Sequence, residues 1–152
     1  MTKAIVVYES KYGNTKIVAE RIAEGLGTGK GIKVDVTNLK DVDLGRISDY
    51  DVILIGSPNH MGRQTRGIKN FIDKLGKLKL KNKSAAVFDT CASKDFEKAV
   101  KKMESQLAKV APGVRLASPG LSIVVTGMKG PMALEDLPKC QEFGKKIAAK
   151  FG

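Results

Sequence analysis

The sequence predicts a three-layer α/β fold built on a doubly wound, five-stranded parallel sheet. Short runs rich in β-branched residues recur five times, and several are nearly unbroken Val and Ile, as expected for strands that helices cover on both faces. Segments with helical periodicity separate these runs. Regular alternation of strands and helices favours right-handed crossovers within a single parallel sheet.

The predicted strands span residues 4–8, 32–36, 51–55, 84–88 and 121–125. The predicted helices between and after them each carry one apolar stripe. These stripes consist of Ile17, Val18, Ile22 and Leu26; of Ile68, Phe71, Ile72 and Leu75; of Phe96, Ala99, Val100, Met103 and Leu107; and of Cys140, Phe143, Ile147 and Phe151. The link at 37–50 is only weakly periodic, so we expect a short or irregular helix there.

The length of 152 residues and the ordinary composition predict one globular domain over residues 1–152. Cys91 and Cys140 are too few for a disulfide scaffold, so we expect reduced thiols in a cytoplasmic protein. The apolar run after Lys3 is too short for a signal peptide, and no apolar run approaches the roughly 20 residues that cross a bilayer. We therefore expect no insertion into a membrane.

The net charge of +11 comes from 27 Lys and Arg against 16 Asp and Glu, and it bears on partners rather than on fold. Nucleic acid is the first partner that such a charge suggests. The lysines, however, are spread over several amphipathic segments, and the chain has no Trp and few aromatic residues for base stacking. We interpret the charge as solvated helix faces and do not expect nucleic-acid binding.

Three loops are candidates for a ligand site. In open parallel sheets, ligands bind beyond the carboxyl ends of the strands, where the strand order reverses. The loops at 9–15, 56–67 and 89–95 follow the first, third and fourth predicted strands. We expect the site among them.

The first loop has the residue types of a phosphate site without a lysine. Ser10 and Thr15 offer hydroxyl groups, Gly13 permits close approach of the backbone, and Asn14 is a good N-cap for the helix that follows. Hydroxyls, the N–H groups of a first helical turn and the positive end of the helix dipole together favour an anion. Asn14 could instead simply cap the helix, but capping alone leaves Ser10 and Gly13 unexplained.

The sequence lacks the residues that other phosphate-binding folds require. The third strand runs into Gly56-Ser57-Pro58 where a receiver domain needs an Asp, and the first loop has no Cys nucleophile for a small tyrosine phosphatase. No G-x-G-x-x-G motif follows a strand. The glycines at 25–29 resemble a nucleotide loop, but they follow a helix, so we interpret them as a helix end and a turn.

Two motifs together resemble the flavodoxin family. The segment Ser10-Lys11-Tyr12-Gly13-Asn14-Thr15 resembles the phosphate loop of flavodoxins, especially the flavodoxin domains of flavodiiron proteins. The segment Ile55-Gly56-Ser57-Pro58-Asn59, with Ile68-Lys69-Asn70-Phe71-Ile72 after it, resembles the second flavin loop and its helix. The resemblance covers essentially the full chain and implies the strand order 2-1-3-4-5 and FMN as cofactor.

Carried over residue by residue, the resemblance implies three groups of FMN-binding residues. They are Ser10, Tyr12, Gly13, Asn14 and Thr15 at the phosphate; Ser57, Pro58, Asn59, His60, Met61 and Gly62 at the isoalloxazine ring; and Thr90, Cys91 and Ala92 in the third loop. No catalytic acid, base, nucleophile or metal ligand is implied. Such proteins shuttle electrons one at a time between redox partners, because the flavin performs the chemistry and the protein tunes it.

For several individual residues, the sequence allows a more specific prediction. Met61-Gly62 resembles the turn in which the methionine packs on the ring and the glycine peptide flips toward N5 of the reduced flavin. Met61 lies in a polar loop and is not expected in the core. His60 could touch the flavin edge or lie in solvent. Cys91 and Cys140 are expected to be buried as small hydrophobic residues.

Three features depart from the flavodoxin pattern and keep other functions open. The absence of Trp predicts weaker flavin stacking, the basic charge predicts acidic partners, and Arg63 follows Gly62 in place of an acidic residue. An electron carrier is the expected function. The alternatives are a flavin-dependent NAD(P)H:quinone oxidoreductase of the same fold and a flavin-free basic module that binds a partner or nucleic acid.

Overall fold

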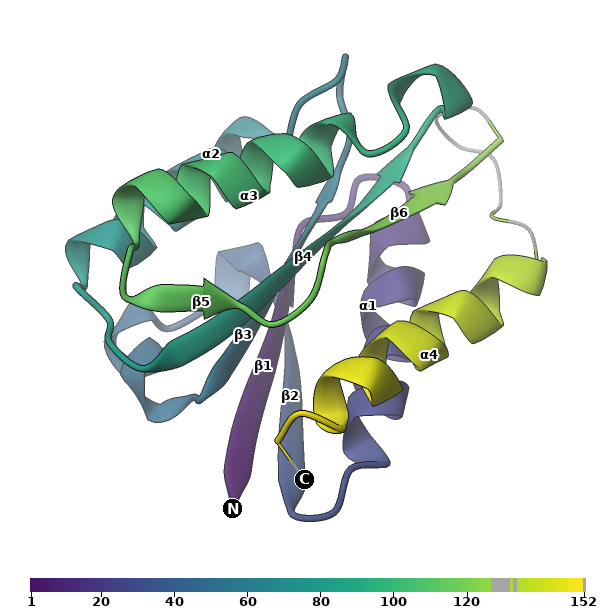
Figure 1. Cartoon of the computed structure of the whole chain (residues 1–152). Coiled ribbons are helices and arrows are strands. Elements are labelled where there is room, and N and C mark those ends of the chain that lie inside the picture. Colours follow the sequence, from purple (N-terminus) through teal and green to yellow (C-terminus); the bar gives the residue numbers. More distant parts are fainter. Residues whose placement is uncertain (127–131, 133, 152) are drawn as a thin grey trace.

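The sheet at the centre of the molecule is parallel throughout (Figure 1). The computed structural model describes residues 1–126, 132 and 134–151. Its strands are β1 (Thr2–Tyr8), β2 (Ile32–Asn38), β3 (Val52–Pro58), β4 (Lys83–Cys91), β5 (Val114–Leu116) and β6 (Leu121–Val124). They are ordered β2-β1-β3-β4-β5, with β6 also paired to β4. The predicted fold class and the strand order 2-1-3-4-5 are confirmed.

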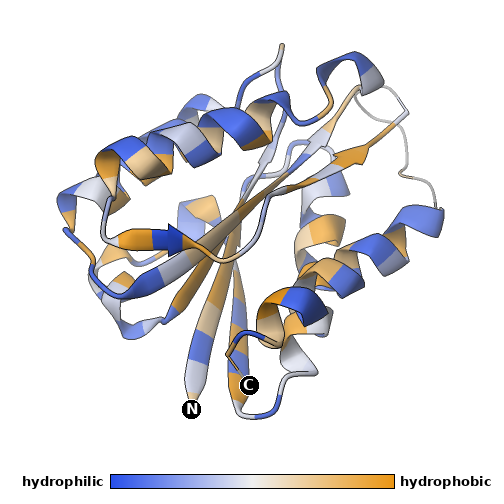
Figure 2. Cartoon of the chain, in the orientation of Figure 1, coloured by the Kyte–Doolittle hydropathy of each residue, from blue (hydrophilic) through white to orange (hydrophobic). Residues whose placement is uncertain are grey.

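Helices cover both faces of the sheet. The pair α1 (Asn14–Gly27) and α4 (Leu137–Ala148) lies on one face, and the pair α2 (Arg66–Lys77) and α3 (Lys98–Val110) lies on the other. Each pair packs its apolar side chains into a separate core cluster. In Figure 2 the helices show mixed polar and apolar bands, whereas the central strands are mainly apolar. This pattern is that of two amphipathic layers around a doubly covered sheet.

Short 3-10 helices complete the fold. The link at 37–50 contains η1 (Leu39–Asp41) and η2 (Leu44–Asp49), which confirms the irregular helix predicted there. The others are η3 (Ser93–Asp95) and η4 (Leu134–Asp136). Within the described ranges, no helix is long and apolar enough to cross a membrane. The assignment of residues 1–152 to one domain stays a prediction.

Close packing between β3 and β4 aligns the loops that follow them. Gly56 of β3 pairs with Phe88 of β4, and the Phe88 side chain is fully buried. A Cβ atom on Gly56 would lie 2.1 Å from the Phe88 ring, so only glycine leaves room for this ring. The two strands stay in register to Pro58 and Thr90, and β4 ends one residue later, at Cys91.

The outermost sheet position beside β4 is interrupted, which the sequence did not predict. The strand predicted at 121–125 is present as β6, but three residues of β5 precede it and also pair with β4. Between the two, Gly120 donates its N–H to Glu104 Oε2 at 3.0 Å. A Val-Arg-Leu segment of three residues is too short to produce a recognisable apolar run.

The prediction that the apolar stripes face the core is wrong for two residues. Ile17 is 40% exposed, because successive helical residues are about 100° apart and Val18 already faces the core. Phe96 is 50% exposed, because α3 begins only after Glu97, whose φ of 64° turns the chain. Phe151 lies beyond α4 but packs against the core.

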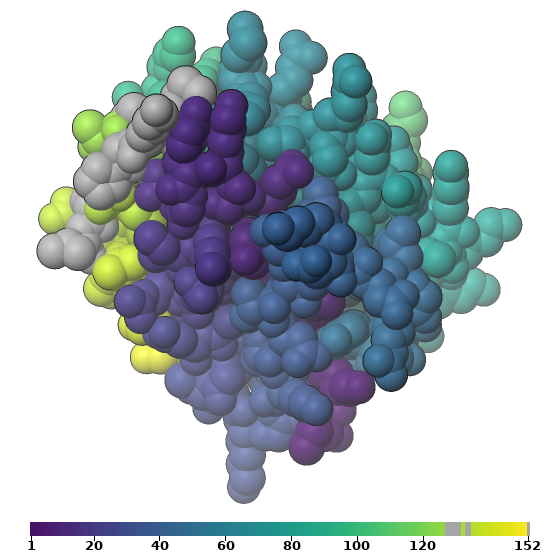
Figure 3. All heavy atoms as spheres, turned by 180° about the vertical axis from the view of Figure 1, so that it is seen from behind, coloured from purple at the N-terminus to yellow at the C-terminus, as the bar shows by residue number. Residues whose placement is uncertain are grey.

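In the view from behind, residues early in the chain form much of the surface (Figure 3).

Candidate functional site

A cavity lies beyond the carboxyl ends of β1, β3 and β4, where sequence reasoning placed the site. Its volume is about 590 Å³, within the range of small-molecule and cofactor sites. Each of the three loops contributes to it. The lining residues are Ser10, Lys11, Tyr12, Asn14, Thr15, Pro58, Asn59, His60, Met61, Thr90, Cys91, Ala92, Lys94, Asp95 and Val125.

Most of the predicted site residues line this cavity, but three do not. Ser57 is fully buried behind it, where its Oγ donates to the Pro58 carbonyl at 2.8 Å and accepts from the Thr65 N–H at 3.0 Å. Gly13 and Gly62 shape the turns beside the cavity without lining it. Sequence reasoning missed Lys11, Lys94, Asp95 and Val125, although Lys11 lies within the quoted phosphate motif.

The N-terminus of α1 is built differently from the prediction. Asn14 is the first helical residue rather than the N-cap, because Gly13 takes the cap position with a φ of 96°. That φ lies in the left-handed region, which glycine adopts without strain. Gly13 has no side chain with which to cap this helix end, and the first amide to donate within the helix is that of Ile17, to the Gly13 carbonyl at 3.1 Å. Preceding N–H groups of such a turn have no partner inside the helix.

Hydroxyl groups gather beside this helix end. Ser10 Oγ accepts from the Gly13 N–H at 3.0 Å, which leaves its own proton for donation. The hydroxyls of Thr15 and Thr90 lie 2.9 Å apart and share one hydrogen bond, so one of the two protons stays available to a ligand. Lys11 also lines the cavity, with its Nζ 5.5 Å from the Tyr12 ring centroid. Sequence reasoning described this anion site without a lysine, and Lys11 is a further residue of the lining. The anion site itself stays a prediction.

A tight hairpin at 60–63 forms one wall of the cavity. His60 and Arg63 exchange backbone hydrogen bonds of 2.8 and 3.1 Å, and Met61 and Gly62 between them have φ values of 54° and 84°. Positive φ at both central residues is the signature of a type I′ turn. Met61 is 92% exposed, which confirms that it is not a core residue.

Asn59 fixes this hairpin, a role that sequence reasoning did not assign. Its Oδ1 accepts from the Gly62 N–H at 2.9 Å, and its Nδ2 donates to the Asp95 carbonyl at 3.0 Å. The second and third loops are thereby joined. Thr65 similarly N-caps α2 and donates its hydroxyl proton to Glu9 in the first loop.

A buried carboxyl lies under the third loop. Asp89 is fully buried at the end of β4, and its oxygens accept from Ser122 Oγ at 2.5 Å and from the Val100 N–H at 3.2 Å. Burial raises its pKa from 3.8 to about 6, although hydrogen bonds from Ser122, Val100 and Asn59 oppose the shift. Asp95, also nearly buried, pairs with Lys98 at 3.3 Å.

Both cysteines are buried, as predicted. Cys91 lies 3.3 Å from Ser122 Oγ, and burial raises the pKa of its thiol. Burial likewise raises the pKa of Cys140 to about 11. These thiols are poor nucleophiles, because the thiolate is the reactive form.

The donor set fits FMN. In the lining, hydroxyls, the start of α1 and Lys11 suit a phosphate. Pro58, Met61, Cys91 and Val125 of the same lining provide the apolar surface that a flat ring needs. No group of three potential metal ligands was found among the described residues.

The comparison with known families decides the assignment. A sequence model of the flavodoxin domain matches residues 5–119. This chain belongs to the flavodoxin family. Flavodoxins bind FMN, which confirms the predicted cofactor at the level of the family.

Individual relatives support the same assignment. The chain is 32% identical over 91 residues to a flavodoxin from Clostridium saccharobutylicum, covering 60% of this chain and 57% of that protein. It is 28% identical over 118 residues to an NAD(P)H dehydrogenase (quinone) from Chromohalobacter salexigens, covering 61% and 59%. The chain therefore spans less than two thirds of the curated relatives that it matches.

Solved structures match over the whole chain. Flavodoxin 2 from Bacillus cereus has a TM-score of 0.84 and 29% identity, covering 99% of this chain and 100% of that chain. The rubredoxin oxygen:oxidoreductase of Desulfovibrio gigas has a TM-score of 0.81 over 99% of this chain and 36% of that chain. At 19% identity, the latter similarity concerns the fold alone.

Proposed function

We propose that this flavodoxin binds FMN non-covalently in the 590 Å³ cavity and carries electrons between redox partner proteins. The observation that carries the proposal is that the start of α1, with its hydroxyl groups, and the 60–63 hairpin both contribute residues to the lining of one cavity. FMN supplies the redox chemistry when bound. The protein's own residues bind, orient and shield it.

The phosphate end consists of the loop at 10–15. Ser10 and Thr15 donate hydroxyl protons to the phosphate, Gly13 gives the loop its turn, and Tyr12 and Asn14 complete the cup. Lys11 adds a positive charge at the cavity wall.

The ring end consists of the hairpin and the third loop. Pro58, His60 and Met61 line one side, and Thr90, Cys91 and Ala92 line another. Ser57 and Asn59 fix the backbone of the second loop by accepting from the N–H groups of Thr65 and Gly62. Gly62 allows the positive φ of the turn. None of these side chains serves as an acid, base or nucleophile, which suits a carrier better than an enzyme with its own substrate.

Titration of the FMN-depleted protein with FMN, followed by flavin fluorescence, tests the binding step. Saturation at one FMN per chain, and stepwise reduction of the bound flavin by a chemical reductant, are the expected results. Absence of saturable binding would leave the flavin-free module as the better description. The cytoplasmic location and the acidic nature of the partners stay predictions.

A flavin-dependent NAD(P)H:quinone oxidoreductase is the second candidate, favoured by the 28% identity to the Chromohalobacter salexigens enzyme. This enzyme would oxidise NAD(P)H in the presence of a quinone without any other protein. The carrier proposal predicts negligible NAD(P)H oxidation by the FMN-loaded protein alone. Turnover of NAD(P)H with a soluble quinone would decide for the enzyme.

A further inference from the structure

A second, smaller pocket has Arg63 of the 60–63 hairpin in its lining, and three of its lining residues are cations. It has a volume of about 260 Å³ and lies between the start of α2 and the middle of α3. Its lining residues are Arg63, Gln64, Lys69, Lys102 and Gln106, and we call it the basic pocket. Arg63 belongs to the 60–63 hairpin, whose His60 and Met61 line the cofactor cavity. The hairpin is therefore a wall common to both.

Two amide side chains give the basic pocket a fixed floor. Gln64 is only 9% exposed, and its Nε2 donates to Gln106 Oε1 at 2.9 Å. Gln106 Nε2 donates in turn to the Lys69 carbonyl and to Asp73 Oδ1, each at 2.8 Å. These bonds tie α3 to α2 and to the segment before α2. The floor of the pocket is consequently fixed by hydrogen bonds within the protein.

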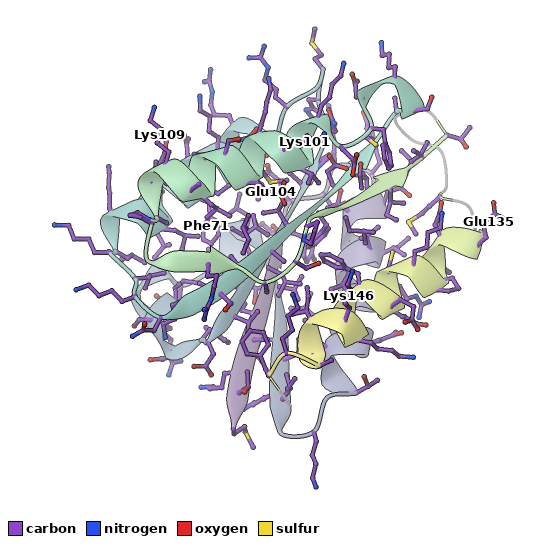
Figure 4. All side chains as sticks on the ribbon, viewed as in Figure 1. Phe71, Lys101, Glu104, Lys109, Glu135 and Lys146 are labelled. Atoms are coloured by element: carbon purple, nitrogen blue, oxygen red, sulfur yellow. The ribbon has the colours of Figure 1, made fainter. Side chains whose placement is uncertain are left out.

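The three cations have no carboxylate partner within the described part of the chain. Arg63, Lys69 and Lys102 are exposed, and none forms an ion pair with a described residue. Asp73 is the acidic residue of α2 and Glu104 that of α3. Asp73 already accepts from Gln106, and Glu104 accepts from the Gly120 N–H. Figure 4 shows Lys101 and Lys109 on the same helix as Glu104. Like charges around one hollow repel each other, and an anion placed between them relieves that repulsion.

We propose that the basic pocket docks an acidic loop of the redox partner and holds it beside the cofactor cavity, an inference that rests on the proposed electron-carrier function. The pocket is smaller than typical small-molecule sites, and its lining contains no aromatic residue on which a nucleotide base could stack. Aspartate or glutamate side chains fit both its size and its charge.

The surface next to the basic pocket has the composition of a protein interface. Met61 is 92% and Phe96 is 50% exposed, and Met, aromatic residues and Arg are enriched at interface cores. Phe96 lies two residues before Lys98, whose side chain lies beside Gly62 in the hairpin. A partner whose acidic loop fills the pocket can therefore cover the hairpin and bring its own redox centre close to the ring.

The double variant K69E/K102E tests this docking, with K30E/K33E as the control. Both variants change the net charge equally, but Lys33 pairs with Lys3 near the amino end of the sheet, away from the cavity. The probe is a reduced, acidic [2Fe–2S] ferredoxin, which passes one electron from its cluster to FMN on the protein. Stopped-flow mixing gives the second-order rate constant.

At low ionic strength, K69E/K102E should react about tenfold more slowly than the wild type, and K30E/K33E should stay within about twofold. Added salt should remove the difference, because it screens exposed charges. Calorimetric titration of the FMN-depleted protein with oxidised ferredoxin should show the same loss of affinity. This second measurement separates failed docking from failed flavin binding.

Two results would overturn the proposal. Equal losses in both double variants would mean that only the overall charge attracts the ferredoxin. Tighter binding of a single-stranded oligonucleotide than of ferredoxin, lost in K69E/K102E but not in K30E/K33E, would assign the pocket to nucleic acid.

Discussion

The buried carboxyl of Asp89 should make the free energy of unfolding depend on pH. In the folded protein its pKa is raised from 3.8 to about 6 by burial, whereas the unfolded chain loses this proton near the ordinary value. Between about pH 4 and pH 6 the folded state therefore holds a proton that the unfolded state has lost. The free energy of unfolding consequently falls as pH rises through that window, by roughly 3 kcal/mol for this group.

Replacing Asp89 with Asn removes this dependence while keeping the size of the side chain. Asn oxygen can still accept from Ser122 or the Val100 N–H, so the variant should fold. Urea unfolding at several pH values between 4 and 7 gives the free energies. Relative to the wild type, Asp89→Asn should gain roughly 2–4 kcal/mol as pH rises across this range.

The control is Asp41→Asn, which removes an exposed carboxylate. Only the change that is specific to Asp89→Asn is attributed to the buried carboxyl. If the Asp89→Asn profile is parallel to the wild type, the carboxyl is not titrating in a buried site and the reasoning fails.

Three further predictions concern the proposed FMN contacts. Thr15→Ala should weaken FMN by about 1.5–3 kcal/mol and riboflavin much less, since only FMN has the phosphate; equal losses in fluorescence titrations would exclude the contact. Gly62→Val should lower the urea midpoint, because a φ of 84° costs a side chain about 1–2 kcal/mol and its Cβ would meet Lys98 at 3.3 Å; an unchanged midpoint would contradict this. Arg63→Glu should make the second one-electron potential more negative by about 20–80 mV in a spectroelectrochemical titration at low salt, and an unmoved or raised potential would place the arginine away from the ring.

Much of the fold could be predicted because its signals are local. The apolar runs of β1 and β3 mark buried central strands, and both are almost entirely buried in the structure. The periodicity of α2 locates its buried face at Ile68, Phe71, Ile72 and Leu75. The short β5 gave no such signal, since sheet pairing with β4 rather than its own composition makes it a strand.

The candidate site, like the fold, could be predicted from the sequence only in part. The loops at 9–15, 56–67 and 89–95 follow from strand positions, and residues of all three line the cavity. The bonds that fix them join distant positions, such as Asn59 with Asp95 and Asp89 with Ser122, and periodicity carries no information about such pairs. Asn14 was assigned as N-cap because Asn favours that position, but the left-handed Gly13 takes it instead.

The interrupted strand beside β4 also bears on how separate molecules of this protein meet. An unbroken outer strand would offer a long row of backbone N–H and C=O groups to another chain, which is a common route to aggregation. Here β5 has three residues and β6 has four, with Pro119 and Gly120 between them. Proline has no N–H to donate, and Glu104 already accepts the Gly120 N–H. Among the described residues, an incoming strand therefore finds two short stretches with a break in the pairing with β4 between them. We expect molecules of this protein to have little tendency to pair sheet to sheet along that edge.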